Sequence, residues 1–383
     1  MDRYLSATLI KDSDKKIILL SGPRQAGKTT LTRHLFSSYD YFNYDASEDR
    51  EALEKKHWKR NVDCVLFDEL HKMPYWKRWL KGVYDTEGNR PRLIVTGSAN
   101  LDTFRKVGDS LAGRYFGFRL HPIDLKEGAM YWKKDIDDIF RRLMECGGFP
   151  EPFLEGDTQF YRRWQKSHLD IILRQDFLDL YSVRSIKLVE TLLELLKSRV
   201  SGPLSYTNLC NDLQIDPKTL KNWLTLLENI YAIFSVTPYH TNVARSLLKE
   251  PKLYFYDIGR VPDEGARLEN LVACALLKEI HWIEDVYGHK GNLHYLKTKD
   301  GVEIDFLVTI DDVPVVCIEV KTSDDVPSKS FNHFKKFLQD VPCIQLVLHL
   351  KREFDHPDGI QMRDLKKFLA TLDLRSYIKK NPN

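Results

Sequence analysis

The chain has 383 residues, of which 43% are hydrophobic and 30% charged, and its formal net charge is +3. This is the composition of a folded, soluble protein, which excludes fibrous and disordered classes. A length above about 250–300 residues favours two or three domains. The small net charge does not predict a nucleic-acid-binding protein, so any DNA surface would be a local patch.

The cysteine pattern and the apolar runs predict where the chain resides. The six cysteines lie far apart without a Cys-x-x-Cys pair, which argues against a disulfide framework and a zinc site. Residues 1–16 lack a signal-peptide core, and the apolar runs are far shorter than the roughly 20 residues of a membrane helix. We therefore expect a cytoplasmic protein without a membrane partner.

Short apolar runs in the first third of the chain predict strands at residues 17–20, 41–44, 62–67 and 93–96. They are too continuously apolar for a half-exposed sheet, so a parallel sheet covered by helices is favoured. Residues 136–197 have a helical pattern, and residues 200–240 predict two short helices joined by a tight turn. The chain is β-rich again after Pro251. We predict an α/β fold with four parts: the parallel-sheet core at 1–125, a helical lid at 126–199, a winged-helix-like module at 200–250 and a β-rich domain at 251–383.

A glycine-rich loop follows the first predicted strand and precedes a helical stretch. In this context a Gly-x-x-x-x-Gly-Lys-Thr run wraps its backbone N–H groups around phosphates, while Lys28 reaches the β- and γ-phosphates and Thr29 binds Mg²⁺. ATP and Mg²⁺ are therefore the predicted cofactors. The predicted nucleotide contacts are Gly22, Pro23, Arg24, Gln25, Ala26, Gly27, Lys28, Thr29 and Thr30.

An acidic pair follows the third apolar run, as the second half of such a site requires. Asp68 is predicted to hold the Mg²⁺ shell, and Glu69 to polarise the attacking water. The strand ending at Thr96 is expected to place a hydroxyl or amide beside the γ-phosphate. Thr96, Ser98 and Asn100 are alternative candidates for this sensing role, with Ser98 taken as a nucleotide contact.

Arg114 lies in a Leu-Ala-Gly-Arg-Tyr run. It is a candidate arginine finger, supplied in trans if subunits form a homo-oligomeric ring. The alternative is a surface arginine that pairs with a neighbouring carboxylate.

Five motifs together resemble a bacterial and archaeal AAA-type ATPase family. They are, in order, Gly22-Pro23-Arg24-Gln25-Ala26-Gly27-Lys28-Thr29, Phe67-Asp68-Glu69, Thr96-Gly97-Ser98, Leu111-Ala112-Gly113-Arg114 and Gly147-Gly148-Phe149-Pro150-Glu151. The resemblance spans nearly the whole chain. It implies a C-terminal domain, long described as of unknown function, that is similar in fold to restriction endonucleases.

Residues 302–321 predict a β-hairpin folded about Asp312, in which Asp305 faces Glu319 and Glu303 faces Lys321. Two like charges directly opposite each other destabilise a hairpin. A divalent cation would offset this repulsion, so Asp305 and Glu319 are candidate Mg²⁺ ligands, and Lys321 would orient a water or stabilise charge on a phosphate. A cross-strand ion pair between Glu303 and Lys321 is the alternative.

The hairpin carboxylates and lysine resemble the PD-(D/E)xK nuclease signature, although Ile304 replaces the proline. Glu269 matches the acidic residue that such folds often carry on a preceding helix, and it joins the predicted metal ligands. In the paired-helix module, Lys218, Thr219, Lys221 and Asn222 begin the second helix, where a recognition helix would contact DNA.

Two functions follow as hypotheses. The first is an ATP-driven machine that binds, remodels or cleaves branched or duplex DNA, with Asp305, Glu319 and Lys321 as the cleaving residues. The second is an ATP-operated switch whose C-terminal domain is a catalytically silent platform for DNA or a protein.

Overall fold

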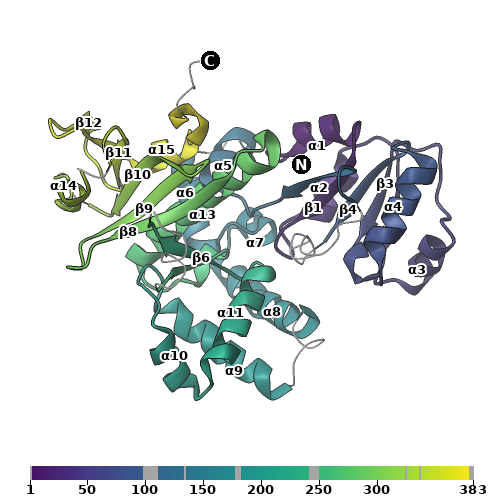
Figure 1. Ribbon diagram of the computed structural model, residues 1–383, viewed down its shortest axis with the longest axis horizontal. Helices are drawn as coiled ribbons and strands as arrows, with labels where there is room; N and C mark the ends of the chain where they lie inside the picture. Colours follow the sequence, from purple (N-terminus) through teal and green to yellow (C-terminus); the bar gives the residue numbers. More distant parts are fainter. Residues whose placement is uncertain are drawn as a thin grey trace. The chain divides into compact units, whose positions relative to one another are not determined.

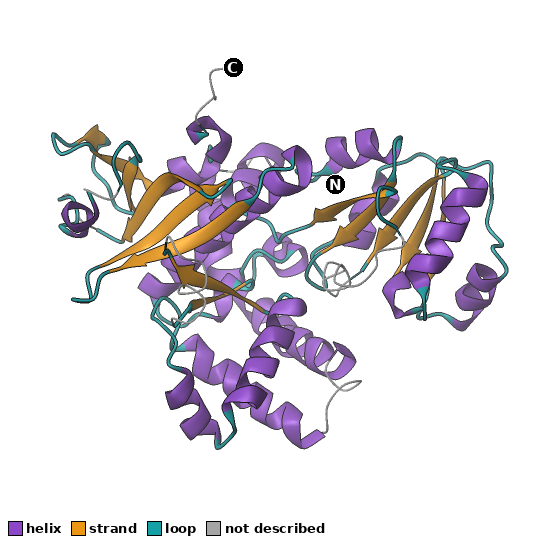
Figure 2. Cartoon of the chain, in the orientation of Figure 1, coloured by secondary structure: helices purple, strands orange, loops and turns teal. Residues whose placement is uncertain are grey.

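The computed structural model describes residues 2–97, 111–132, 135–176, 183–240, 250–323, 326–335 and 338–378. The chain forms two compact units. Unit 1 comprises residues 1–122 and 229–231, and unit 2 comprises residues 123–228 and 232–383. Each unit contains its own β-sheet, so the predicted α/β fold is confirmed (Figures 1 and 2). No helix among the described residues is both long and apolar enough to cross a membrane.

Unit 1 is built on a five-stranded sheet in the order β2-β3-β4-β1-β5, in which every neighbouring pair is parallel. The strands are β1 (Ile17–Ser21), β2 (Tyr39–Asn43), β3 (Cys64–Asp68), β4 (Arg92–Thr96) and β5 (Tyr115–Arg119). The predicted strands and their parallel arrangement are therefore confirmed. Because parallel strands end at the same edge, the segments that follow β1, β3 and β4 meet there.

The inner strands of unit 1 are covered on both faces. Every residue of β1 and β3 is buried, although successive side chains point to opposite faces of a sheet. The helices of this unit are α1 (Ser6–Ser13), α2 (Lys28–His34), α3 (Ser47–Glu54), the 3₁₀ turn η1 (Leu70–Lys72) and α4 (Trp76–Glu87). An aromatic group of Phe42, Trp58, Phe67 and Trp79 packs between the sheet and these segments. This core fixes the strand ends that carry the nucleotide motifs.

Unit 2 contains an eight-stranded mixed sheet in the order β12-β13-β11-β10-β9-β8-β6-β7 (Figure 2). Its strands are β6 (Ile233–Pro238), β7 (Lys252–Phe255), β8 (Gly291–Lys297), β9 (Glu303–Ile310), β10 (Val313–Lys321), β11 (Cys343–Val347), β12 (Phe354–Asp355) and β13 (Ile360–Asp364). The β10–β11 and β11–β13 pairs are parallel, whereas β8, β9 and β10 are joined antiparallel. The long helix α13 (Glu264–Tyr287) contacts β7, β8, β9 and β10.

The remaining helices of unit 2 precede or flank its sheet. They are α5 (Leu125–Trp132), α6 (Ile136–Cys146), α7 (Pro150–Glu155), α8 (Thr158–Asp176), α9 (Val183–Lys197), α10 (Tyr206–Leu213), α11 (Pro217–Asn229), η3 (Ile258–Arg260), α14 (Ser330–Phe334), α15 (Leu365–Ala370) and η4 (Leu374–Tyr377). The two helices expected between residues 200 and 240 are α10 and α11.

The division into units differs from the four predicted parts. The first break follows Pro122 rather than residue 125, and residues 126–199, 251–383 and all of 200–250 except 229–231 are grouped in one unit. Contacts within unit 2 explain this grouping. Helices α5 and α6 contact α15, α6 also contacts α13, and β6 and β7 extend the C-terminal sheet. Two of the predicted lid helices, α5 and α6, thus pack against helices of the C-terminal part.

Candidate functional site

The loop between β1 and α2 requires glycine at two positions. Gly22 has φ +143°, and a Cβ atom there would lie 2.3 Å from the backbone oxygen of Leu120. Gly27 has φ 92° and is the N-cap of α2. Larger residues would meet a backbone clash at the first position and a strained left-handed conformation at the second. The predicted turn is therefore built by the residues that the motif specifies.

Arg3 anchors this loop, and sequence reasoning did not identify it. Its guanidinium donates to the backbone oxygen of Ala26 at 2.8 Å and to that of His121 at 2.7 Å. The side chain is only 3% exposed. A buried arginine bonded to two carbonyl groups ties the loop to the segment after β5. No local pattern marks Arg3, because the atoms that it binds are distant in sequence.

Lys28 is buried in the loop, with 6% exposure. Its Nζ donates to the backbone oxygens of Gly22 at 2.8 Å and Pro23 at 2.7 Å. The ammonium is thus held where the motif requires a phosphate contact. Of the other predicted contacts, Ala26 is buried with Pro23, Arg24 is half-buried, and Gln25 and Thr30 are exposed.

Asp68 is the centre of a hydrogen-bond network at the sheet edge. Its Oδ2 accepts from the hydroxyls of Thr29 and Tyr41, each at 2.8 Å, and its Oδ1 accepts from Thr96 Oγ1 at 2.5 Å. The predicted Thr29 and Asp68 are therefore brought together. A hydroxyl and a carboxylate oxygen at this separation fit the hard oxygen ligands that Mg²⁺ prefers.

Tyr41 is a second residue that sequence reasoning missed. Burial raises the pKa of Tyr41 above its ordinary value, and its hydrogen bond to Asp68 raises that pKa further. The phenol therefore remains a neutral donor, and it orients the carboxylate of Asp68 toward Thr29. Tyr41 could have been suspected only from its position on β2, the strand next to β3. Nothing in the neighbouring sequence distinguishes it from a tyrosine that packs in the core.

Glu69 adopts the left-handed backbone conformation, with φ 55°. Strain of this kind costs of the order of 1–3 kcal/mol and persists where surrounding contacts impose it. The Glu69 N–H donates to the Thr96 oxygen at 3.0 Å, while Oε2 lies 3.6 Å from His71 Nε2 and 3.7 Å from Lys72 Nζ. The Glu69 backbone is thereby tied to the end of β4, and its carboxylate lies beside two basic side chains.

The remaining predicted residues of unit 1 have different outcomes. Thr96 lies at the network, bonded to Asp68, whereas Ser98 and Asn100 lie outside the described residues. Arg114 Nε is 2.7 Å from Asp85 Oδ1, which is the ion pair that the sequence left as an alternative. Its role as an arginine finger stays a prediction, as does the homo-oligomer.

The predicted hairpin register in unit 2 is confirmed from Val316 onward, after a register shift between Pro314 and Val316. Val316 pairs with Val308 and Ile318 with Phe306, so the next pair brings Glu319 beside Asp305. The Asp305 N–H donates to Glu319 Oε2 at 3.3 Å, and the Val320 N–H donates to Asp305 Oδ2 at 2.9 Å. The two carboxylates are thus neighbours, as expected.

Lys252 lies in the middle of these carboxylates and was not predicted. Its Nζ is 2.6 Å from Glu303 Oε1, 3.1 Å from Glu269 Oε1 and 3.6 Å from Asp305 Oδ1, and the side chain is 1% exposed. Glu303 Oε2 also lies 3.3 Å from Lys297 Nζ. Lys321 Nζ lies 2.8 Å from Glu319 Oε1, and its pairing with Glu303 stays a prediction.

These contacts change the argument for a metal ion. The repulsion between Asp305 and Glu319 is offset by two ammonium groups and two backbone N–H groups of the protein itself. In the part of the chain that the structure describes, no group of three or more His, Cys, Asp or Glu side chains is arranged to hold a metal ion. Metal binding by Asp305, Glu319 and Glu269 therefore stays a prediction, because the repulsion between Asp305 and Glu319 no longer requires a cation.

The protonation of the carboxylate cluster follows from its burial. Burial alone would lower the pKa of Lys252, but Glu269, Asp305 and Glu303 raise it above its ordinary value. Burial, followed by the charge of Asp305, raises the pKa of Glu269 to about 8 and that of Glu319 to about 7. Tyr254 also donates a hydrogen bond of 2.6 Å to Glu269. Lys252 is therefore charged at neutral pH, and the cluster retains part of its protons.

The candidate DNA-contacting residues occupy the first turns of α11. Lys218, Lys221 and Asn222 are exposed. The hydroxyl of Thr219, in contrast, donates to Asp216 Oδ2 at 2.5 Å, and Asp216 also accepts from the backbone of this turn. Thr219 is therefore part of the helix cap, which leaves the two lysines and the asparagine facing solvent.

Three family models match consecutive parts of the chain. Residues 14–129 match the family described as AAA domain, residues 137–262 a domain of unknown function (DUF8612), and residues 264–366 a domain of unknown function (DUF4143). The loop geometry of unit 1 agrees with the match of residues 14–129 to an AAA domain. This match supports ATP binding and hydrolysis, whereas the third match assigns no activity to unit 2.

Similar whole chains have no assigned function either. An uncharacterized protein of Mycobacterium tuberculosis is 24% identical, over 89% of this chain and 78% of that protein. An uncharacterized protein of Methanocaldococcus jannaschii is 26% identical, over 72% of this chain and 70% of that protein. Among solved structures, RuvB of Thermotoga maritima is 16% identical over 64% of this chain and 92% of its own, with a TM-score of 0.32. A STAND ATPase of Pyrococcus horikoshii is 14% identical over 75% of this chain and 48% of its own, with a TM-score of 0.25.

Proposed function

We propose that this chain is a magnesium-dependent ATPase that couples ATP hydrolysis in unit 1 to DNA binding or remodelling by unit 2. The observation that carries the first half is the 2.8 Å contact between Thr29 Oγ1 and Asp68 Oδ2. It joins the two halves of a nucleotide site that lie far apart in the sequence.

Four residues of the site divide the work of hydrolysis. The Lys28 ammonium exchanges its bonds to loop carbonyl groups for phosphate oxygens. Thr29 and Asp68 would hold Mg²⁺, which when bound neutralises charge on the phosphates. The Glu69 carboxylate accepts a proton from the attacking water, and its strained backbone holds it against the end of β4.

The second half of the proposal rests on α10 and α11, two short helices that follow one another with a tight turn. Exposed Lys218 and Lys221 at the start of the second helix match the phosphate-contacting positions of a recognition helix. Because the net charge of the chain is only +3, such a local pair of lysines is the kind of surface that DNA binding would need.

This coupling predicts that DNA accelerates phosphate release by the wild-type chain. The double variant Lys218→Ala/Lys221→Ala should bind DNA more weakly, with a salt dependence that is shallower by about one unit of slope for each lost phosphate contact. Fluorescence anisotropy over a salt series, together with a phosphate-release assay, measures both effects. Lys290→Ala, which removes an exposed lysine elsewhere in unit 2, is the matched control. Equal DNA affinity of wild type and double variant would contradict the role of α11.

A catalytically silent unit 2 is the second candidate, and the position of Lys252 favours it. An internal ammonium already compensates the carboxylates that a nuclease would use for its metal ions. The DNA recovered from the assay above distinguishes the two candidates. Intact DNA supports the silent platform, whereas Mg²⁺-dependent nicks that are absent with Asp305→Ala would establish cleavage at this cluster.

A further inference from the structure

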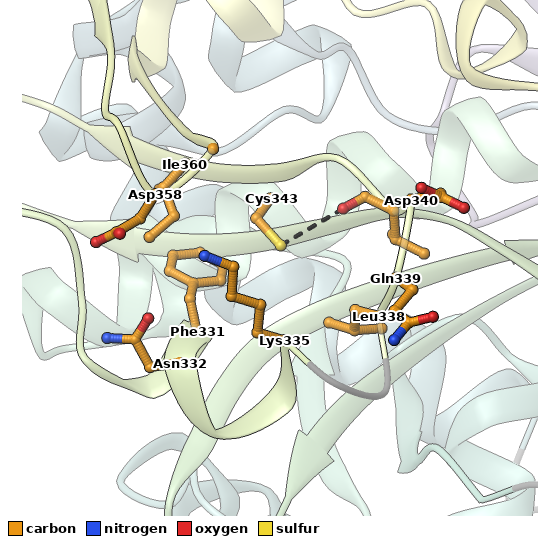
Figure 3. Close-up of a pocket in the computed structure, with 11 residues that line it drawn as sticks. Phe331, Asn332, Lys335, Leu338, Gln339, Asp340, Cys343, Asp358 and Ile360 are labelled. Carbon is orange, nitrogen blue, oxygen red and sulfur yellow. Dashed lines mark hydrogen bonds between the residues drawn. The ribbon is translucent and has the colours of Figure 1, made fainter.

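A pocket of about 340 Å³ lies at the edge of the unit 2 sheet that carries β11 and β13. Its wall includes Cys343 at the start of β11, Asn332 in α14, Lys335 directly after α14, and Asp358 in the turn before β13. Figure 3 shows the Cys343 sulfur and the Lys335 side chain directed into this pocket. Cys343 is partly exposed, so a small solute has access to its sulfur.

A second cysteine lies next to Cys343 on the neighbouring strand. In the parallel register of β10 and β11, Cys317 is the direct partner of Cys343. Adjacent strands lie about 4.8 Å apart, which is within the Cα separation of roughly 4.4–6.8 Å that a disulfide spans. Both are free cysteines, and Cys317 is fully buried, with 0% exposure. Cys317 can therefore be reached from within the protein but not from solvent.

The two sulfurs have unequal surroundings. Cys343 lies in the wall of the pocket together with Lys335, and its Sγ is 3.6 Å from the backbone oxygen of Val341. The neighbouring Cys317 and then the charge of Lys335 lower the pKa of Cys343, in spite of partial burial. Cys343 is therefore the sulfur that a solute in the pocket meets, and Cys317 is the enclosed sulfur beside it. Desolvation raises the pKa of the buried Cys64 and of the partly exposed Cys274, so both should react more slowly.

We propose that Cys343 is an oxidation site for small hydroperoxides and that Cys317 resolves the product into an intramolecular disulfide between β10 and β11. The Cys343 thiolate attacks the outer oxygen of the hydroperoxide, so an S–O bond forms, the O–O bond breaks and an alcohol or water leaves after taking a proton. The Cys317 sulfur, losing its proton, then attacks the sulfenic acid, an S–S bond forms and water leaves. The two thiols give up two electrons, which the hydroperoxide accepts.

The site differs from the nucleotide site and does not depend on the proposed ATPase activity. Its position nonetheless bears on unit 2. Glu319 follows Cys317 by two residues in β10, and Gln345, its register partner, follows Cys343 by two residues in β11. A disulfide would covalently join these strands beside the carboxylate cluster that contains Lys252.

Native thiol labelling of the full chain tests the first step. A limiting amount of iodoacetamide should modify Cys343 at least about tenfold faster than each of the other five cysteines, because it lines the pocket and its pKa is lowered. Lys335→Met should slow the labelling of Cys343 several-fold without changing that of Cys274. Labelling of Cys343 no faster than that of Cys274 would overturn the proposal, and this readout requires no cysteine variant to fold.

Peptide mapping after brief treatment with hydrogen peroxide tests the second step. Under non-reducing digestion, wild type should yield a linked peptide containing Cys317 and Cys343, which a dithiol reverses. Cys317→Ser should stop at a sulfenic acid on Cys343 that dimedone traps, and Cys274→Ser should behave as wild type. A wild-type chain whose Cys343 proceeds to sulfinic acid without a disulfide would show that Cys317 does not resolve it and would reject the proposal.

Discussion

Replacement of Glu69 by glutamine should lower the rate of ATP hydrolysis by about 100- to 10,000-fold while ATP binding is retained. The amide has nearly the same shape as the carboxylate but cannot accept a proton from water. The strained backbone at this position and the contact of its N–H with Thr96 do not involve the side chain, so the loop should keep its geometry. Phosphate release at saturating Mg²⁺ and ATP, with affinity for a fluorescent ATP analogue, measures both properties.

Glu51→Gln is the matched control for that substitution. Glu51 is an exposed carboxylate of α3 in the same unit, where it pairs with Lys55 at the surface. Its replacement should leave hydrolysis and binding unchanged. If Glu69→Gln hydrolyses ATP at a rate similar to that of the control, Glu69 is not the group that activates water.

The second large effect is expected at Lys252. Lys252→Met keeps an unbranched buried side chain but leaves Glu269, Glu303 and Asp305 without the ammonium between them. Removing one partner of a buried ion pair costs about 3–5 kcal/mol. Hydrogen exchange read by mass spectrometry on β7 and β9 should show this loss as a lower free energy of opening. Lys290→Met, which breaks only an exposed pair with Asp312, should cost less than about 1 kcal/mol.

The loss at Lys252 should depend on pH in a defined direction. A carboxyl whose pKa is raised in the folded protein binds its proton more tightly there than in the unfolded chain. For Glu269 this stabilising uptake is complete below its unfolded pKa of 4.5 and is lost as pH rises towards about 8. Without Lys252, the stability of the folded protein should depend more steeply on pH over this window. Lys252→Met/Glu303→Gln should recover part of the loss. A cost for Lys252→Met equal to that for Lys290→Met would contradict the account.

Features determined by short stretches of sequence were predictable. The loop at Gly22 and Gly27 is specified by consecutive residues, because the motif itself defines the backbone conformation. The hairpin turn was predictable from Asp311 and Asp312, which have φ 51° and 65°, the left-handed conformations of a tight turn. The turn alone does not place Asp305 opposite Glu319, because a register shift between Pro314 and Val316 moves the pairing by one residue.

Features that depend on distant segments were not predictable. Arg3 and Tyr41 act on atoms that are tens of residues away, and a single arginine or tyrosine carries no local signal. Lys252 begins a short strand, where a lysine normally faces solvent. Its burial results from carboxylates contributed by α13 and by the β9–β10 hairpin. The grouping of the predicted lid helices with the C-terminal sheet likewise depends on helix contacts that periodicity cannot specify.

The most direct test of the proposed ATPase compares phosphate release by the wild-type chain and Lys28→Ala in the presence of Mg²⁺. Lys28 is the buried ammonium held by the loop, and its loss removes the contact to the phosphates without filling the site. The account predicts Mg²⁺-dependent turnover by wild type that EDTA abolishes, and a reduction of about 100-fold or more in the variant. Phosphate release of equal rate in both proteins, or none in the wild type, would contradict it.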